Sequence, residues 1–220
     1  MTDLAPGYSY APPTDPLRVI HHDAHLLVVD KPAGLLTVPG KGADKADCLI
    51  TRLRADFPDV LLVHRLDTDT SGVIVFALTK LAQGHLGKQF EHRQTQKAYI
   101  ARVWGVVHED QGQIDLPLIV DWPNRPCQHV NHETGRPAQT DWTVLSRDDA
   151  ETRMELRPLT GRSHQLRVHM AAAGHPILGD PLYATGPATD FPRLMLHARM
   201  IGFRHPQGGT PVRFESPVPF

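Results

Sequence analysis

The chain has 220 residues, of which 40% are hydrophobic and 21% charged, and its formal net charge is −1. This content suffices for one sizeable core, and the near-neutral charge argues against nucleic-acid binding through overall positive charge, while leaving a local basic surface possible. The two cysteines cannot form a disulfide framework, and no apolar run approaches the roughly 20 residues that span a membrane, so we expect a cytoplasmic protein.

The N-terminus carries no basic patch followed by an apolar stretch, and therefore does not resemble a secretory signal. Four prolines occur within the first 16 residues. Residues 1–17 are therefore predicted to be an extended, poorly ordered tail. We expect residues 18–220 to form a single domain.

Hydrophobic periodicity predicts the main elements of this domain. A buried strand is expected at 25–30, closed by a turn at 31–34 in which Pro fixes φ and Gly supplies a positive one. Further expected elements, in chain order, are a helix at 48–57, a central strand at 72–78, a helix capped by Thr79 and running to Phe90 with Leu81, Leu86 and Phe90 in the core, a strand at 98–104, and a hairpin of strands at 139–145 and 151–156. Strands and helices do not alternate regularly, so the predicted fold class is α+β, a mixed, largely antiparallel central sheet with flanking helices.

Residues 63–73, VHRLDTDTSGV, set His64, Arg65, Asp67 and Asp69 between apolar residues and end in Thr-Ser-Gly. The alternation of a strand does not require such a mixture. This stretch is therefore a candidate for chemistry.

A second dense stretch runs from Thr160 to Gly174. Ser163 can cap a helix that ends at Gly174, with Leu166, Met170 and Ala173 on its buried side. Arg167 lies on another face of this helix. A buried guanidinium needs an anion, and Asp67 is its natural candidate, because the opening stretch packs charge into apolar sequence in the same way.

The sequence HRLDTDTSG resembles the His-Arg-Leu-Asp-x-x-Thr-Ser-Gly signature of the RluA family of pseudouridine synthases. Five further motifs resemble those of the family and occur in its order, so the resemblance covers residues 18–216: DKPAGL at 30–35, KAY at 97–99, TGRSHQLR at 160–167, GDPLY at 179–183 and RLMLHA at 193–198. We expect no separate RNA-binding domain of the small kind that many relatives carry. DWPNRP at 121–126 resembles the RluA branch itself.

The resemblance implies an isomerase that turns uridine into pseudouridine in a cleft across the sheet, without metal or other cofactor. Its implied substrates are structured RNAs, namely the tRNA anticodon stem-loop (position 32) and a hairpin of 23S rRNA (position 746). We expect a monomer with no obligate protein partner and no membrane association. The implied roles are catalysis by Asp67, stacking of Tyr99 on the target base, pairing of Arg167 with Asp67, displacement of the base by Arg65, and further substrate binding or loop positioning by His64, Arg162, His164 and Gln165.

The chemistry of these residues agrees with the implied roles. A carboxylate acts as nucleophile or base only when ionised, and Arg167 would oppose the rise in pKa that burial of Asp67 causes. Tyr99 offers a ring for stacking and a phenol that could exchange a proton. Whether Asp67 attacks the base, attacks the sugar or removes a sugar proton stays open. Residues 80–102 hold five basic residues and one acidic residue, which suits a phosphate-contacting surface as well as a solvated helix face.

The sequence leaves three alternative functions open. In a glycoside hydrolase, Asp67 and Asp69 would be the acid and base, about 6.6 Å apart on one strand face, but the 6% aromatic content is thin for a sugar groove. In a metal site, His21, His22 and His25 would be ligands, although HHDAH lacks the helical pairing of zinc hydrolases. A non-catalytic RNA-binding module is the third, and the intact set of Asp67, Tyr99 and Arg167 argues against it.

Overall fold

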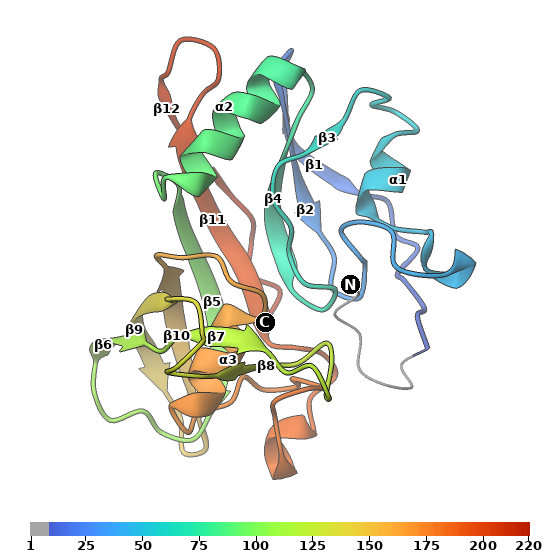
Figure 1. Cartoon of the computed structure of the whole chain (residues 1–220). Coiled ribbons are helices and arrows are strands. Elements are labelled where there is room, and N and C mark those ends of the chain that lie inside the picture. Colours follow the sequence, from blue (N-terminus) through green and yellow to red (C-terminus); the bar gives the residue numbers. More distant parts are fainter. Residues whose placement is uncertain (1–8) are drawn as a thin grey trace. The chain divides into compact units, whose positions relative to one another are not determined.

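The computed structural model describes residues 9–220 (Figure 1). Part of the predicted tail, residues 1–8, lies outside the described residues. Residues 9–17 contain no helix or strand, but they are tied to the first unit. The Tyr10 hydroxyl donates to the carbonyl of Asp47 at 2.8 Å and accepts from the backbone N–H of Leu36 at 3.0 Å.

The described chain divides into two compact units, residues 9–97 with 198–219, and residues 98–197 with Phe220. Both boundaries fall inside strands, β5 (Gln96–Trp104) and β11 (Leu196–Arg204). A single catalytic domain over residues 18–220 stays a prediction. Among residues 9–220, no helix is long and apolar enough to span a membrane.

The first unit is built from strands with two α-helices and a short 3-10 helix. Its elements are β1 (Arg18–His22), β2 (Leu26–Lys31), η1 (Ala43–Lys45), α1 (Leu49–Leu53), β3 (Leu61–Leu62), β4 (Ser71–Ala77), α2 (Lys80–Glu91), the start of β5, most of β11, and β12 (Pro211–Glu215). The predicted central strand is confirmed as β4, whose seven residues are all buried. Thr79 caps α2 as predicted, because its side chain accepts from the N–H of Ala82 at 3.1 Å.

The pairing of β2 with β4 brings two motifs together. Lys31, at the end of β2, lies opposite Gly72, at the start of β4. The turn after β2 therefore lies beside the loop before β4, and the N–H of Gly34 donates to the carbonyl of Thr68 at 2.9 Å. Gly34 has φ +78°, as its place in the turn predicted.

The second unit contains the predicted hairpin. Its elements are the rest of β5, β6 (Gln111–Asp115), β7 (Leu118–Val120), β8 (Gln128–Val130), β9 (Gln139–Arg147), β10 (Glu151–Pro158), α3 (Gln165–Ala172) and the 3-10 helix η2 (Gly186–Thr189). Strand β10 pairs with both β9 and β5, and β9 also pairs with β6. The hydrophobic core includes Met154, Leu156, Leu166 and Met170.

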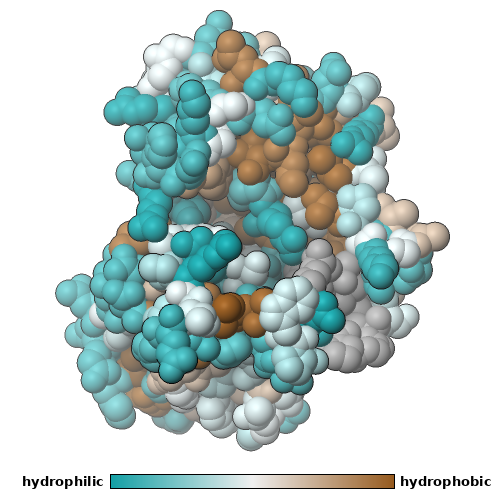
Figure 2. All heavy atoms as spheres, viewed as in Figure 1, coloured by the Kyte–Doolittle hydropathy of each residue, from teal (hydrophilic) through white to brown (hydrophobic). Residues whose placement is uncertain are grey.

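Every strand pair whose register is described is antiparallel, which confirms the predicted fold class. On the face viewed in Figure 2, hydrophilic side chains cover most of the outer surface, while hydrophobic ones gather over part of the first unit.

Some local predictions were wrong. Helix α1 is shorter than residues 48–57, because Cys48 is its N-cap, its last turns tighten, and Pro58 prevents continuation. Leu81 is 70% exposed, whereas Ala82 and Leu86 are fully buried, so the buried face of α2 is rotated from the predicted one.

Helix α3 also departs from its predicted cap. His164, not Ser163, occupies the N-cap position, in a left-handed conformation with φ 52°. Ala173 is exposed rather than buried, and all residues from Gln165 to Met170 are buried. This burial extends around the helix because α3 is enclosed on several sides, and it includes Arg167.

Candidate active site

Asp67 lies in a loop between β3 and β4, and its flanking backbone is held by buried donors. The Nζ of Lys31, fully buried, donates to the carbonyl of Thr68 at 2.8 Å and to that of Pro32 at 2.9 Å. The same Thr68 carbonyl accepts from the N–H of Gly34. The residue after Asp67 is thus fixed by two donors from the DKPAGL motif.

The residue before Asp67 is fixed from a different segment. The hydroxyl of Thr37 donates to the carbonyl of Leu66 at 2.7 Å, and the N–H of Leu66 approaches the same oxygen at 3.3 Å. Thr37 and the Leu66 side chain are buried, while Asp67 itself is half-buried. A carboxylate on a backbone held from both sides is preorganised for chemistry.

Asp69 lies in a turn, not on a strand. Residues 68 and 69 form the turn, which the N–H of Thr70 closes by donating to the carbonyl of Asp67 at 3.2 Å. The alternate strand positions on which a glycosidase pair depended do not exist here. Asp69 is a turn carboxylate.

His64 has a structural position in the first unit. Its Nε2 accepts from the N–H of Val75 at 3.2 Å, and its ring stacks on Phe90 with centroids 4.6 Å apart. Burial, together with the positive charge of Lys97, lowers the pKa of His64 to about 3, and burial lowers the pKa of Lys97 to about 8. His64 is therefore neutral at pH 7, with its proton on Nδ1. Arg65, the next residue, is exposed.

Arg167 lies on α3 in the second unit, and its side chain is 1% exposed. Its Nε donates to Oδ2 of Asp180 at 2.7 Å and its Nη2 to Oδ1 at 2.6 Å. Asp180, in the GDPLY motif, therefore supplies an anion to this buried guanidinium. No local signal in the sequence indicates this partner, because Asp180 lies 13 residues away along the chain. The pairing of Arg167 with Asp67, implied by the resemblance, stays a prediction.

Tyr183 of the same motif joins Arg167 to the start of α3. Its ring centroid is 5.1 Å from the guanidinium carbon of Arg167, and its oxygen accepts from the N–H of Gln128 at 2.9 Å. The hydroxyl proton is then available to Nδ1 of His164, 2.7 Å away. Burial raises the pKa of Tyr183, so it remains a neutral phenol.

The polar groups of Gln165 are used within the protein. Its Oε1 accepts from the Thr160 hydroxyl and the N–H of Arg162, and its Nε2 donates to the carbonyl of Gln139 and to Thr140. These four bonds fill its capacity, which favours a positioning role. The side chain of Arg162 is also used within the protein, since its Nε donates to the carbonyl of Pro137, just before β9, at 3.1 Å.

Tyr99 lies on β5 opposite Leu156 and packs, half-buried, against the core of the second unit. Asp67 belongs to the first unit, and Tyr99 and Arg167 to the second. The structure thus gives each residue a defined local setting, and their joint action stays a prediction.

The histidines considered as metal ligands have other contacts. His21 and His205 both bond to one carboxylate oxygen of Asp23, at 2.8 and 3.0 Å, and the ring of His22 meets Phe57 edge-on. His25 bonds to Gln207 at 3.1 Å. Within the part of the chain described, no group of three or more His, Cys, Asp or Glu residues could hold a metal ion.

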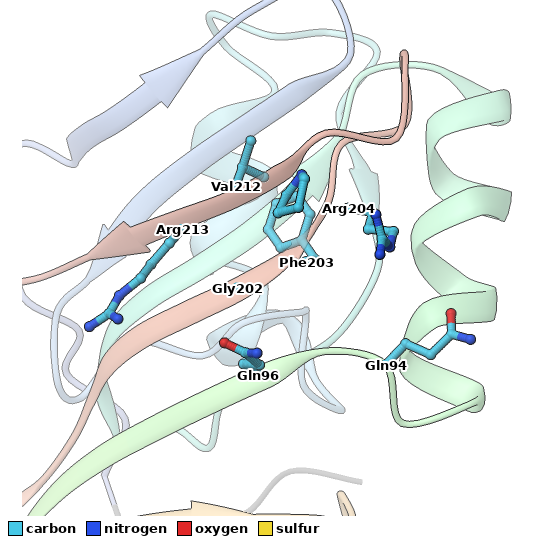
Figure 3. A pocket seen from close by; sticks show the side chains of 8 residues that line it. Gln94, Gln96, Gly202, Phe203, Arg204, Val212 and Arg213 are labelled. Carbon is cyan, nitrogen blue, oxygen red and sulfur yellow. The ribbon is translucent and has the colours of Figure 1, made fainter.

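A shallow groove of about 320 Å³ lies in the first unit where β11 pairs with β12 (Figure 3). Gly202, opposite Arg213, lacks a side chain that would fill it, and Gln96 lies across from this gap. Arg213 and Arg199 both contact the carboxylate of Glu215. None of the sequence motifs indicates this groove.

Comparison with known proteins adds a family assignment. The sequence model of a family described as RNA pseudouridylate synthase matches residues 25–172. A protein of Yersinia pestis named dual-specificity RNA pseudouridine synthase RluA is 55% identical over 204 residues, 92% of this chain and 99% of that protein. A protein of the same name from Escherichia coli K12 is 51% identical over 215 residues, 96% of this chain and 98% of that protein.

Two solved human structures are also similar. RNA pseudouridylate synthase domain containing 1 has a TM-score of 0.78 at 31% identity, covering 99% of this chain and 87% of that one. RNA pseudouridylate synthase domain containing 4 has a TM-score of 0.75 at 26% identity, covering 92% of this chain and 88% of that one.

Proposed function

Because the chain belongs to the RNA pseudouridylate synthase family, we propose that it isomerises uridines in stem-loops of both tRNA and large-subunit ribosomal RNA, with Asp67 as the catalytic carboxylate. The observation that carries this proposal is the double support of the Asp67 loop, by Lys31 and Gly34 on one side and Thr37 on the other. The names of the Yersinia and Escherichia relatives, dual-specificity synthases, support two RNA targets.

The reaction rearranges bonds without adding or removing atoms. The bond from the ribose to the uracil nitrogen breaks, the base turns while it is held, and a bond from the ribose to a ring carbon forms. The proton on that ring carbon leaves, and one is returned to the nitrogen. The target base must leave its stack to be reached, and Arg65, exposed beside Asp67, is suited to help displace it.

The roles of the protein groups follow from their chemistry. Asp67 acts in its ionised form, as a nucleophile toward base or sugar or as a base toward a sugar proton. Tyr99 supplies a ring for stacking on the turned base and a phenol for proton exchange. Arg167 is the proposed cationic partner of the Asp67 carboxylate. Because the backbone on both sides of Asp67 is held in place, the Asp67 loop needs little reorganisation during the reaction.

The decisive experiment compares Asp67→Asn with Asp69→Asn, two isosteric changes two residues apart. Each variant is incubated with total tRNA and ribosomal RNA from a strain lacking the gene, and pseudouridines are mapped at nucleotide resolution. Asp67→Asn should reduce product to background and change RNA affinity by less than about tenfold, or 1.4 kcal/mol, because phosphate contacts carry most of the affinity. Asp69→Asn should leave most activity. Product at a near wild-type rate from Asp67→Asn would exclude Asp67 from the mechanism, and product in only one RNA class would remove the second target.

A further inference from the structure

The loop between β7 and β8 presents an exposed tryptophan. Trp122 is 59% exposed. Among the large hydrophobic residues that are exposed within residues 9–220, it is the only aromatic one. Trp104 and Trp142, by contrast, pack half-buried against the core of the second unit. Most of the Trp122 side chain therefore lies in solvent, where a partner can reach it.

One face of this indole is covered by an arginine. The guanidinium carbon of Arg125 lies 4.7 Å from the ring centroid, and its Nε donates to the carbonyl of Trp122 at 3.1 Å. Within residues 9–220, neither Nη group of Arg125 donates a hydrogen bond. A flat aromatic surface and a pair of free N–H donors are therefore presented together.

The loop that carries both side chains is internally bonded. The N–H of Asp121 donates to the carbonyl of Cys127 at 2.9 Å, and the N–H of Cys127 donates to that of Asn124 at 3.0 Å. The side-chain amide of Asn124 donates to the carboxylate of Asp121 at 2.8 Å. A loop that is already ordered loses little conformational entropy when it binds.

The loop is also attached to the cluster that holds Arg167. Gln128 follows the loop at the start of β8, and its N–H donates to the oxygen of Tyr183, whose ring lies against Arg167. Trp122 is therefore held at a fixed position relative to a residue to which the proposed function assigns a catalytic role.

We propose that Trp122 stacks on an unpaired nucleobase of the RNA stem-loop outside the target uridine, while Arg125 donates to the phosphate next to that base. This inference rests on the proposed RNA substrate and adds a contact that positions it. Aromatic rings stack on splayed bases of single-stranded loops, and the guanidinium fork matches a phosphate. A base on the open face of the indole completes a sandwich with Arg125 on the other.

The direct test uses fluorescence of Trp122 in a protein that binds without turnover. Trp104→Phe, Trp142→Phe and Asp67→Asn are combined, and the protein is titrated with a synthetic RNA hairpin that has uridines in its loop. Stacking should quench the emission by at least about half, and a fully paired duplex or a hairpin with an abasic loop should not. Equal quenching by the duplex, or hairpin binding with unchanged emission, would overturn the inference and leave the proposed function intact. No binding of the hairpin at all would overturn both.

A kinetic test that keeps Trp104, Trp142 and Asp67 covers the case in which the combined variant does not fold. Trp122→Ala should raise KM for the hairpin at least about fivefold and change kcat less than twofold, since one stacked base is worth about 1–3 kcal/mol. Trp122→Phe should restore most of the affinity, and Trp122→Leu should not. The control Leu145→Ala removes another exposed apolar side chain, 51% exposed, and should have no effect.

Two results of this series would contradict stacking. One is a Leu variant as good as the Phe variant, which would indicate apolar contact only. The other is a Trp122→Ala protein with unchanged KM but a lower mass in sedimentation, which would assign the indole to a contact between two copies of the chain.

Discussion

Arg167 and Asp180 form a bidentate ion pair that is almost completely buried, with side chains 1% and 0% exposed. Asp180 also accepts from the backbone N–H groups of Leu182 and Tyr183, at 2.9 and 3.2 Å. The carboxylate thus receives four donors, and these hold it in one orientation. The pair fixes the guanidinium of Arg167 from the GDPLY motif, independently of any contact that Arg167 makes with Asp67.

Replacing Asp180 with Asn should destabilise the protein by about 3–5 kcal/mol, because the buried guanidinium of Arg167 loses the negative charge of its bidentate partner. Urea unfolding at neutral pH measures the change. The matched control is Asp47→Asn, which breaks the bidentate pair of Asp47 with Arg52 at 47% and 21% side-chain exposure. That change should cost less than about 1 kcal/mol. Equal costs for the two variants would contradict a buried ionic role for Asp180.

Replacing Lys31 with Met should lower both stability and kcat. The change keeps the apolar stem in its buried site but removes the donor to the carbonyls of Pro32 and Thr68, which should cost about 1–3 kcal/mol. Since Thr68 adjoins Asp67, a small displacement of the loop should reduce kcat at least about tenfold with little change in KM. Single-turnover and steady-state kinetics, with exposed Lys41→Met as control, measure this split. A normal kcat in a destabilised Lys31→Met protein would show that the ammonium does not position Asp67.

His64 should make the folded state less stable as the pH falls below about 6.5. Its pKa is lowered to about 3 in the folded protein, so between these values the unfolded chain binds a proton that the folded one does not. The contribution is a loss of up to about 1.4 kcal/mol for each pH unit from about 6.5 toward 3. Urea unfolding of wild type and His64→Gln between pH 5 and 7 measures it, and the variant should have the shallower slope.

The control for this titration is His132→Gln, which removes an exposed histidine and should leave the slope unchanged. In addition, Lys97→Met should raise the pKa of His64 in an NMR titration, because the charge of Lys97 is one of its two causes. A His64 resonance that titrates near 6.5 in the wild type would contradict the assignment of a neutral, buried ring.

Periodicity and turn chemistry predicted the elements whose signals are local. Strand β4 is a continuous apolar run, and Thr79 is a good N-cap followed by a helical pattern, so each could be predicted without knowledge of its neighbours. The predicted buried faces of the helices were wrong at Leu81 and Ala173, which are both exposed. The buried face of a helix depends on which other elements cover it, and the local sequence does not contain that information.

For the site, the sequence by itself determined the residue types and their order: the HRLDTDTSG and TGRSHQLR motifs, and through their resemblance the family to which the chain belongs. Only the tertiary structure decided which groups hold them. The partners Lys31 to Thr68, Thr37 to Leu66 and Arg167 to Asp180 are 37, 29 and 13 residues apart. A buried ammonium or guanidinium requires an acceptor, but its burial does not identify the residue that provides this acceptor. Which oxygen meets it is set by strand pairing and loop closure, and these depend on the packing of the whole unit.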